Sequence, residues 1–294
     1  MADVVSPVTD RVALISSERG LRLDPDLPLA MAALREAGHA VDLVRWDDEA
    51  VDWNAYGLAV VRSCWDYTWR LAEFLAWAGT VPRLRNALEL LRWNTDKTYL
   101  RDLEEAGLPV VPTVWNPTDA AELPDAGEWV VKPSVSAGSR DTARWSEAPA
   151  ALAHVAELTR AGRTAMVQPY LASVDHDGET AILFIGGRFS HAVRKGPLLQ
   201  PGEGVRQDRD SRGDLRRVDP TRAQRDVAQS VFEAIGTLVP EAAPPLYARI
   251  DLVRDAAGRP VIMELELTEP SLFLPQAPEA AASFVHAVEA DLQR

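Results

Sequence analysis

Two runs of alternating apolar and charged residues near the end of the chain constrain the fold more than any other feature. The runs YARIDLVR and VIMELEL are separated by the turn segment DAAGRP. Alternation with a period of two is typical of strands with one apolar face, so the segment predicts a β-hairpin. The apolar face is expected to carry Ile250, Leu252, Met263 and Leu265.

The other face of this hairpin concentrates acids. If Arg254 lies opposite Val261, then Asp251 lies across from Glu264, and Arg249 across from Glu266. Two carboxylates about 5 Å apart repel by roughly 3 kcal/mol at an effective dielectric of 20, so a cation is expected between them. An oxygen-only ligand set suits Mg²⁺. The same pattern also fits the solvated outer face of an ordinary hairpin.

Composition limits the class of protein. The chain has 294 residues, of which 47% are hydrophobic and 26% charged, as in globular proteins. Its net charge of −13 argues against nucleic acid or an anionic membrane as a partner. The single cysteine, Cys64, and five scattered histidines provide neither a disulfide framework nor a zinc site. The first residues show no basic region followed by a long apolar core, and no stretch of 18 apolar residues occurs, so we expect a cytoplasmic protein.

Residues 1–92 are predicted to form a separate α/β domain. Short apolar runs such as RVALIS and YGLAVVRS alternate with amphipathic helices, which is typical of an open parallel sheet. Ligands bind at the carboxyl ends of such strands, where Arg62, Ser63, Trp65 and Asp66 are candidate substrate contacts. These residues could equally be ordinary loop packing. Neither a GxGxxG nor a P-loop motif is present.

Residues 93–294 are predicted to form an α+β region whose strands are paired by hairpins. We divide it into 93–170 and 171–294. A helix is expected from Asn94 or Thr95 to Gly107, with Lys97 in its first turn, where the macrodipole disfavours a cation. The polar stretch 196–219 is expected to be a mobile binding loop.

Two further stretches suggest a phosphate and a base site. Lys132 ends the apolar strand WVVK and precedes a loop of small residues, SVSAGSR, whose backbone N–H groups can approach a phosphate. A lysine at a strand end is also commonly a surface residue. In MVQPYL, Pro169 ends the ladder, so the backbone of Tyr170 and Leu171 is predicted to be free for another partner. An edge strand leaving its sheet would look the same.

In this order and spacing, Lys97, Lys132 with its loop, QPYL, and Asp251 followed by Glu-x-Glu resemble the ATP-grasp superfamily of ligases. The resemblance covers roughly residues 93–275, and residues 1–92 look like the family's N-terminal domain. RSCWDY, RWNTDK and ELELTEPSLF look nearest to its antibiotic-pathway branch, which includes cycloserine-forming ligases. The commonest family pattern is Glu-x-Asn, so Glu266 is a departure that fits two Mg²⁺ ions.

The resemblance implies a role for each candidate residue. ATP would be bound by Lys97, Lys132, Ser136, Ala137, Gly138, Gln168, Pro169, Tyr170, Leu171, Asp175 and Glu179. The implied magnesium ligands are Asp251, Glu264 and Glu266, and the implied catalytic cations are Arg249, Lys195 and Arg206. Glu269 and Ser271, just past the metal strand, join the predicted substrate contacts.

The expected activity is ATP-dependent formation of a C–N bond on a small amino-acid-like substrate, through an acyl-phosphate intermediate. One alternative is intramolecular cyclisation of O-ureido-D-serine to D-cycloserine, with a urea or carbamoyl group activated in place of a carboxylate. Another is an inactive nucleotide-binding regulator. A homo-oligomer is compatible with the sequence.

Overall fold

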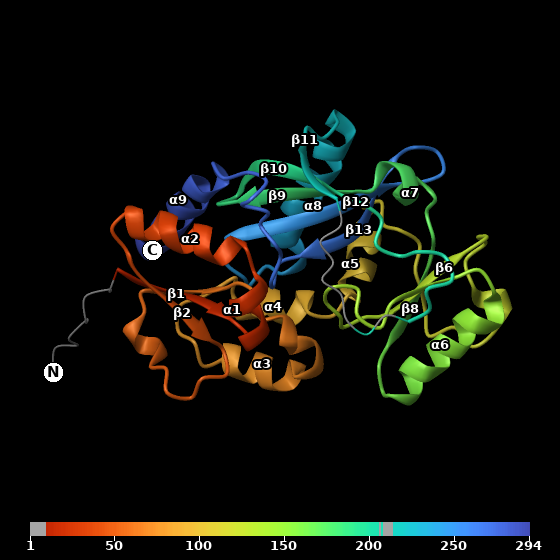
Figure 1. Ribbon diagram of the computed structural model, residues 1–294, viewed down its shortest axis with the longest axis horizontal. Helices are drawn as coiled ribbons and strands as arrows, with labels where there is room; N and C mark the ends of the chain where they lie inside the picture. Colours follow the sequence, from red (N-terminus) through yellow and green to blue (C-terminus); the bar gives the residue numbers. More distant parts are fainter. Residues whose placement is uncertain (1–9, 206, 208–213) are drawn as a thin grey trace.

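The chain forms three sheets arranged around one cavity. The computed structural model describes residues 10–205, 207 and 214–294. The first sheet and the third sheet lie towards opposite ends of the long axis, and the second sheet lies between them (Figure 1). This combination of one parallel and two antiparallel sheets is the predicted α/β plus α+β architecture.

The first sheet is parallel and has the order β2-β1-β3-β4, as the alternation of strands and helices predicts. Its strands are β1 (Arg11–Ser16), β2 (Ala40–Arg45), β3 (Leu58–Val61) and β4 (Leu84–Arg85). The helices and 3₁₀ turns of this region are α1 (Glu18–Leu23), α2 (Asp26–Glu36), η1 (Trp53–Ala55), η2 (Trp65–Trp69), α3 (Leu71–Ala78) and α4 (Leu88–Asn94). β1 and β3 are almost entirely buried, which explains their continuous apolar runs.

The third sheet is antiparallel and is covered by α6 (Figure 1). Its order is β5-β8-β6-β7. The elements of this region are α5 (Tyr99–Glu105), β5 (Val114–Trp115), η3 (Ala120–Glu122), β6 (Trp129–Pro133), β7 (Ala143–Trp145), α6 (Ala148–Arg160) and β8 (Ala165–Pro169). The small-residue loop connects β6 to β7, where the sequence predicts it.

The second sheet is antiparallel and contains the predicted terminal hairpin. Its order is β11-β10-β9-β12-β13. The elements of this region are α7 (Ser173–Asp177), β9 (Glu179–Ile185), β10 (Arg188–Lys195), β11 (Leu215–Val218), α8 (Arg222–Leu238), β12 (Tyr247–Arg254), β13 (Pro260–Glu266) and α9 (Ala280–Leu292).

A β-bulge in the β12–β13 hairpin corrects the predicted register at the turn. Arg254 pairs with Pro260, not with Val261, and the register shifts between Asp251 and Leu252. Beyond the shift, Asp251 pairs with Glu264 and Arg249 with Glu266, as the sequence predicts. The bulge accommodates Met263 as the extra residue, and this side chain lines the cavity instead of joining the core of Ile250, Leu252 and Leu265.

The predicted helix from Asn94 or Thr95 to Gly107 is wrong at its start. Asn94 is the last residue of α4, and α5 begins at Tyr99. The Asn94 side chain does not cap a helix, because its Nδ2 donates to the Leu265 carbonyl (2.8 Å) and its Oδ1 accepts from the Leu267 N–H (2.6 Å). Lys97 therefore lies between two helices, and the macrodipole argument does not apply to it.

Part of the stretch predicted to be a loop is a strand. Leu215–Val218 forms β11, the edge strand beside β10, with Lys195 opposite Leu215. The sequence did not predict this strand because its residues are mostly polar, as is common in an edge strand that exposes much of its surface. Residues 206 and 208–213 lie outside the described part of the chain.

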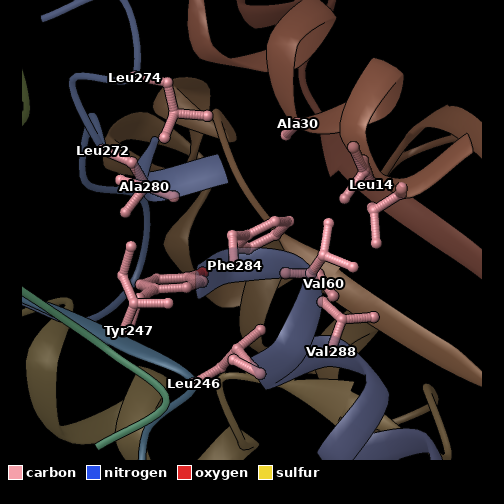
Figure 2. Close-up of a cluster of buried hydrophobic side chains, with 14 of the residues drawn as sticks. Leu14, Ala30, Val60, Leu246, Tyr247, Leu272, Leu274, Ala280, Phe284 and Val288 are labelled. Atoms are coloured by element: carbon pink, nitrogen blue, oxygen red, sulfur yellow. The ribbon is translucent and has the colours of Figure 1, made fainter. Parts of the chain in front are cut away.

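The last helix, α9, returns to the first sheet. It packs against α2 and β3, and Figure 2 shows Phe284 and Val288 of α9 beside Leu14 and Val60 of that sheet. The same cluster includes Tyr247 of β12. The N-terminal region thus shares its core with the last helix of the chain. The division into domains at 1–92, 93–170 and 171–294 remains a prediction. No helix in the described residues has the length and apolarity needed to cross a membrane.

We predict that Asn86→Ala strongly destabilises the junction between the first and second sheets. Buried Asn86 donates to the carbonyls of Tyr247 (2.9 Å) and Leu267 (2.7 Å) and accepts from the Leu246 N–H (2.6 Å). Leaving these three groups unpaired should lower the free energy of unfolding by about 3 kcal/mol or more, measured by urea titration. The exposed Asn54→Ala should change it by less than about 0.5 kcal/mol; equal effects would contradict the prediction.

Candidate active site

One cavity of about 430 Å³ gathers most of the predicted site residues. Those that line it are Lys97, Lys132, Ser136, Ala137, Gly138, Gln168, Pro169, Tyr170, Leu171, Glu179, Lys195, Arg249, Glu264, Glu266, Trp65, Glu269 and Ser271. Those that do not line it are Arg62, Ser63, Asp66, Asp175 and Asp251. Arg206 lies outside the described part of the chain.

Three carboxylates of the β12–β13 hairpin converge at the base of the cavity. Asp251, Glu264 and Glu266 each offer an oxygen, and these oxygens lie within 4.8 Å of one another. Asp251 is fully buried directly behind the cavity wall. The cluster has only oxygen donors, which is the ligand chemistry of Mg²⁺. It is the only such group of acids or metal-binding side chains within the described residues.

Arg249 and Lys195 neutralise the deepest of these acids. The Arg249 Nε lies 2.9 Å from Asp251 Oδ1, and the Lys195 Nζ lies 2.6 Å from Asp251 Oδ2. Burial alone would raise the pKa of Asp251, but these two cations outweigh it and lower the pKa to about 2. Arg249 also pairs with Glu266, and Lys195 with Glu179 at 2.6 Å. The cations that the acidic face requires are therefore supplied by the protein itself.

Two buried lysines face the cavity from the other side. Lys97 pairs with Glu264 at 3.1 Å and donates to the Ser136 carbonyl at 2.7 Å. Lys132 is also buried, and desolvation lowers the pKa of its ammonium. Lys97 thus links Glu264 to the small-residue loop, in which Gly138 has a positive φ of 62°. A phosphate placed between loop and hairpin would meet both ammonium groups.

After β8, only some of the backbone groups of Tyr170 and Leu171 are free to bind another partner, although the sequence predicts this for all of them. The Tyr170 N–H is not free, because it donates to the Glu128 carbonyl (2.8 Å). The Tyr170 carbonyl and the Leu171 N–H form no hydrogen bond with the described residues. Buried Gln168 keeps its Oε1 without a partner. This edge therefore presents a donor and an acceptor side by side.

Asp175 is not in the cavity wall because other side chains hold it elsewhere. Its carboxylate accepts from the Tyr170 hydroxyl (2.6 Å) and pairs with Arg144 (3.2 Å). The Arg144 guanidinium also lies over the Tyr170 ring, 3.5 Å from its centroid. These contacts hold Asp175 outside the cavity wall in this conformation, and its predicted contact with ATP stays a prediction.

Three of the predicted substrate contacts are packed behind the cavity. The Arg62 guanidinium donates to the Pro270 carbonyl (2.7 Å), Ser63 Oγ lies 2.7 Å from Ser16 Oγ, and Asp66 accepts from the Trp46 indole (2.9 Å). The strand end is covered by α1, where Gly20 packs so closely that a Cβ would come within 2.2 Å of the Ser63 carbonyl. Trp65 alone of the residues predicted at this strand end reaches the cavity.

Other residues of the cavity wall were not predicted. They include Asp26, Tyr67, Trp69, Arg140 and Phe273. Tyr67 and Trp69 belong to the same WDYTW turn as Trp65, so their proximity could have been inferred from the sequence. The sequence around Asp26 carries no comparable signal.

Glu266 and Glu269 are the acids that burial affects most. Burial, with Arg249 acting in the opposite sense, raises the pKa of Glu266 to about 7. Burial and the neighbouring Glu266 raise the pKa of Glu269 to about 8. Glu269 contacts the Tyr67 hydroxyl but forms no ion pair with the described residues. This side of the cavity therefore favours a cation.

Comparison with known proteins identifies the class. The fold matches ATP-grasp ligases over nearly the whole chain, including PsnB in complex with a minimal precursor, Mg and ADP (TM-score 0.61, 18% identity, covering 96% of this chain and 98% of that one). D-alanine–D-alanine ligase from Bacillus anthracis has a TM-score of 0.62 at 13% identity, covering 97% of each chain. The fold is thus the predicted ATP-grasp fold.

Closer relatives identify the family. Residues 12–89 match the model of the N-terminal domain of D-cycloserine synthetase DcsG. The chain is 37% identical to the cycloserine biosynthesis protein DcsG of Streptomyces lavendulae, covering 94% of this chain and 97% of that protein. The crystal structure of D-cycloserine synthetase DcsG has a TM-score of 0.88 at 35% identity, covering 96% and 99% of the two chains. The chain belongs to the D-cycloserine synthetase family of ATP-grasp ligases, and is therefore an ADP-forming ligase, not an inactive regulator.

We predict that Glu269→Gln stabilises the protein in alkaline solution without Mg²⁺. The folded-state pKa of Glu269 is raised from its ordinary value of 4.5 to about 8, so between these pH values the carboxyl is protonated in the folded state and ionised in the unfolded state, and stability falls as the pH rises through this range. The variant cannot ionise, so its melting temperature should exceed that of the unmodified protein at pH 8.5 and approach it at pH 4.5.

Differential scanning calorimetry across this pH range tests the prediction. Exposed Glu105→Gln serves as the control and should follow the unmodified protein at every pH. A constant difference between Glu269→Gln and the unmodified protein would show that Glu269 does not titrate as described.

Proposed function

We propose that this chain phosphorylates the carboxylate of a small amino-acid-like substrate with ATP and then joins the activated carbon to a nitrogen. The proposal rests on the groups that surround one cavity. Buried lysines, the acidic triad of hairpin carboxylates, and the backbone carbonyl of Tyr170 and N–H of Leu171, which are unpaired among the described residues, lie on three sides of it. Charge neutralisation and positioning supply most of the catalysis in phosphoryl transfer, and these groups suit that task.

The nucleotide is proposed to lie between the third and second sheets. The Tyr170 carbonyl and Leu171 N–H would bind the adenine edge, with the partly unpaired Gln168 nearby. Lys97 and Lys132 would hold the phosphates beneath the loop that contains Gly138. Glu179 also borders this space, while Pro169 fixes the backbone at the strand end. Because Ser136 and Ala137 are small, the backbone N–H groups of the loop can come close to the phosphates.

Asp251, Glu264 and Glu266 would hold Mg²⁺, and their oxygen-only donors and mutual spacing fit it. When bound, Mg²⁺ neutralises phosphate charge during transfer. Glu266 supplies a carboxylate where the commonest family pattern has an amide, which supports two ions. Binding of the nucleotide would give Lys97 a phosphate partner in exchange for Glu264, which would keep a partner of opposite charge in the metal, so neither of these two charges would be left unpaired.

Arg249 is proposed to stabilise the oxyanion of the tetrahedral intermediate. Its guanidinium lines the cavity and is oriented by Asp251 and Glu266. In that step the substrate nitrogen forms a bond to the acyl carbon, the C–O bond to phosphate breaks, and phosphate leaves with the electron pair and takes up the proton that the nitrogen loses. Lys195 faces the same acids and would neutralise the transferring group, and Arg206 stays a prediction for the same role.

The substrate is proposed to lie between Trp65 and residues 269–276. Glu269 would bind its ammonium, because this buried carboxylate faces the cavity without an ion-pair partner among the described residues. Ser271 provides a hydrogen-bonding group beside it. A small zwitterionic amino acid fits this arrangement, and a location in the cytoplasm, where ATP is supplied, accords with it. A homo-oligomer is left open.

A second candidate is ring closure within one substrate molecule. The similarity to D-cycloserine synthetase over nearly the whole chain favours it. The substrate would be O-ureido-D-serine and the product D-cycloserine. The nucleophilic nitrogen would be carried by the activated molecule itself, and its bond to the carbamoyl group would break, with that group leaving as carbamic acid, that is, as CO₂ and ammonia. Mass spectrometry separates the two candidates, since cyclisation consumes one amino substrate per ADP and ligation consumes two.

We predict substrate-dependent ADP release that is lost when the acidic triad is altered. ADP should be released when ATP and Mg²⁺ are supplied with an amino-acid substrate. The L- and D-enantiomers of the amino acids are tested singly and in pairs. Asp251→Asn and Glu266→Gln should each lower kcat by at least about a hundredfold, because each removes a charge that would neutralise Mg²⁺.

The control is Asp42→Asn, which alters the contacts of Asp42 with Arg11 and Tyr56, outside the cavity wall, and should leave kcat within about twofold. Unchanged turnover in both triad variants would exclude the proposed metal site. Binding of long peptides alone would exclude a small-molecule substrate.

A further inference from the structure

The segment that follows β13 forms one wall of the substrate side without pairing in any sheet. We call residues 270–274 the substrate strap. Ser271 and Phe273 line the cavity, and Phe273 also packs against the core that contains the fully buried Leu272 and Leu274. Figure 2 shows these two leucines in the core that α9 shares with the first sheet. The strap therefore separates the shared core from the substrate.

Buried side chains, in place of a neighbouring strand, bind the backbone of the strap. Arg62 donates to the Pro270 carbonyl (2.7 Å), and His191 Nε2 lies 2.8 Å from the Leu272 carbonyl. Both oxygens of Asp26 accept backbone N–H groups, Oδ2 from Leu272 (2.6 Å) and Oδ1 from Leu274 (2.8 Å). Phe273, between these two residues, has a positive φ of 54°, so the strap is not an extended strand.

Asp26 is the contact that fixes this conformation most tightly. It is the first residue of α2 and is 1% exposed. A buried carboxylate is costly unless it is hydrogen-bonded, and each of its oxygens receives a backbone donor from the strap. Helix α2 thus helps to fix, through this side chain, where Ser271 and Phe273 lie in the cavity.

We propose that Asp26 is a positioning residue for the amino substrate. It acts by holding Ser271 and Phe273 at the cavity wall opposite the Trp65 turn, while the nucleotide side is held by other elements. The inference rests on the proposed substrate side of the cavity. Arg62 is proposed to hold the strap in the same way, through the Pro270 carbonyl, instead of contacting the substrate directly as the sequence predicts.

The test is Asp26→Asn, which preserves the size of the side chain but turns an amide N–H₂ towards one of the two backbone donors. The KM of the amino substrate should rise by at least about tenfold, because misplacement of a binding wall weakens substrate positioning. The KM of ATP should stay within about twofold. Hydrogen exchange measured by mass spectrometry should become faster in the peptide containing Leu272 and Leu274.

The control is Asp119→Asn, an exposed acid at the start of the 3₁₀ turn η3, away from the strap. Its Oδ1 accepts the Ala121 N–H (2.8 Å), and an asparagine retains that acceptor. It should leave both KM values and the exchange rate of the strap within about twofold of the unmodified protein. Equal rises in the KM of ATP and of the amino substrate in Asp26→Asn, or equal effects of the two variants, would overturn the proposal.

A second variant covers the case in which Asp26→Asn does not fold. Pro270→Gly loosens the strap backbone while all its hydrogen-bonding groups remain, and it should raise the KM of the amino substrate but not that of ATP. The exchange measurement needs no turnover. If the unmodified protein releases no ADP with any amino acid, the proposed function fails, whereas unchanged exchange in Asp26→Asn rejects the role of Asp26.

Discussion

The pairing of β12 with β13 is the interaction on which the site depends. Its register sets Asp251 opposite Glu264 and Arg249 opposite Glu266, so acids that repel each other are brought to one face together with the cation that neutralises them. A bulge beside Asp251 lets this register coexist with a different pairing at the turn. A shift by one residue would bury the carboxylates in the apolar core and turn the leucines towards the cavity.

The hairpin is held in place by residues that precede it and by a helix that follows it in the chain. Asn94 and Asn86 bind the backbone of the second sheet around Leu267 from one side, and α9 covers it together with the first sheet from the other. The cavity is therefore built between regions whose relative position is fixed by buried polar contacts and a shared apolar core. The small-residue loop and the backbone edge at Leu171 complete it from the third sheet.

The fold class and the centre of the site could be predicted from the sequence because they depend on local patterns. Period-two alternation revealed the hairpin, and the order of Lys97, Lys132 and Asp251 revealed the family. The residues around the substrate could not be predicted in this way. Arg62 follows a strand at the expected sheet edge, yet it turns inward to the Pro270 carbonyl, a contact between residues far apart in the sequence. Asp26 is a single acid at a helix start, and only the fold brings it to the strap.

The central proposal is that Asp251, Glu264 and Glu266 hold Mg²⁺, and that Lys97 exchanges Glu264 for a phosphate when nucleotide binds. The most direct test is the anomalous difference map of crystals grown with Mn²⁺ and a non-hydrolysable ATP analogue. The account predicts a manganese peak within coordination distance of Asp251, Glu264 and Glu266, with the Lys97 ammonium moved from Glu264 to a phosphate oxygen. A manganese peak elsewhere, with the pair between Lys97 and Glu264 intact, would contradict it.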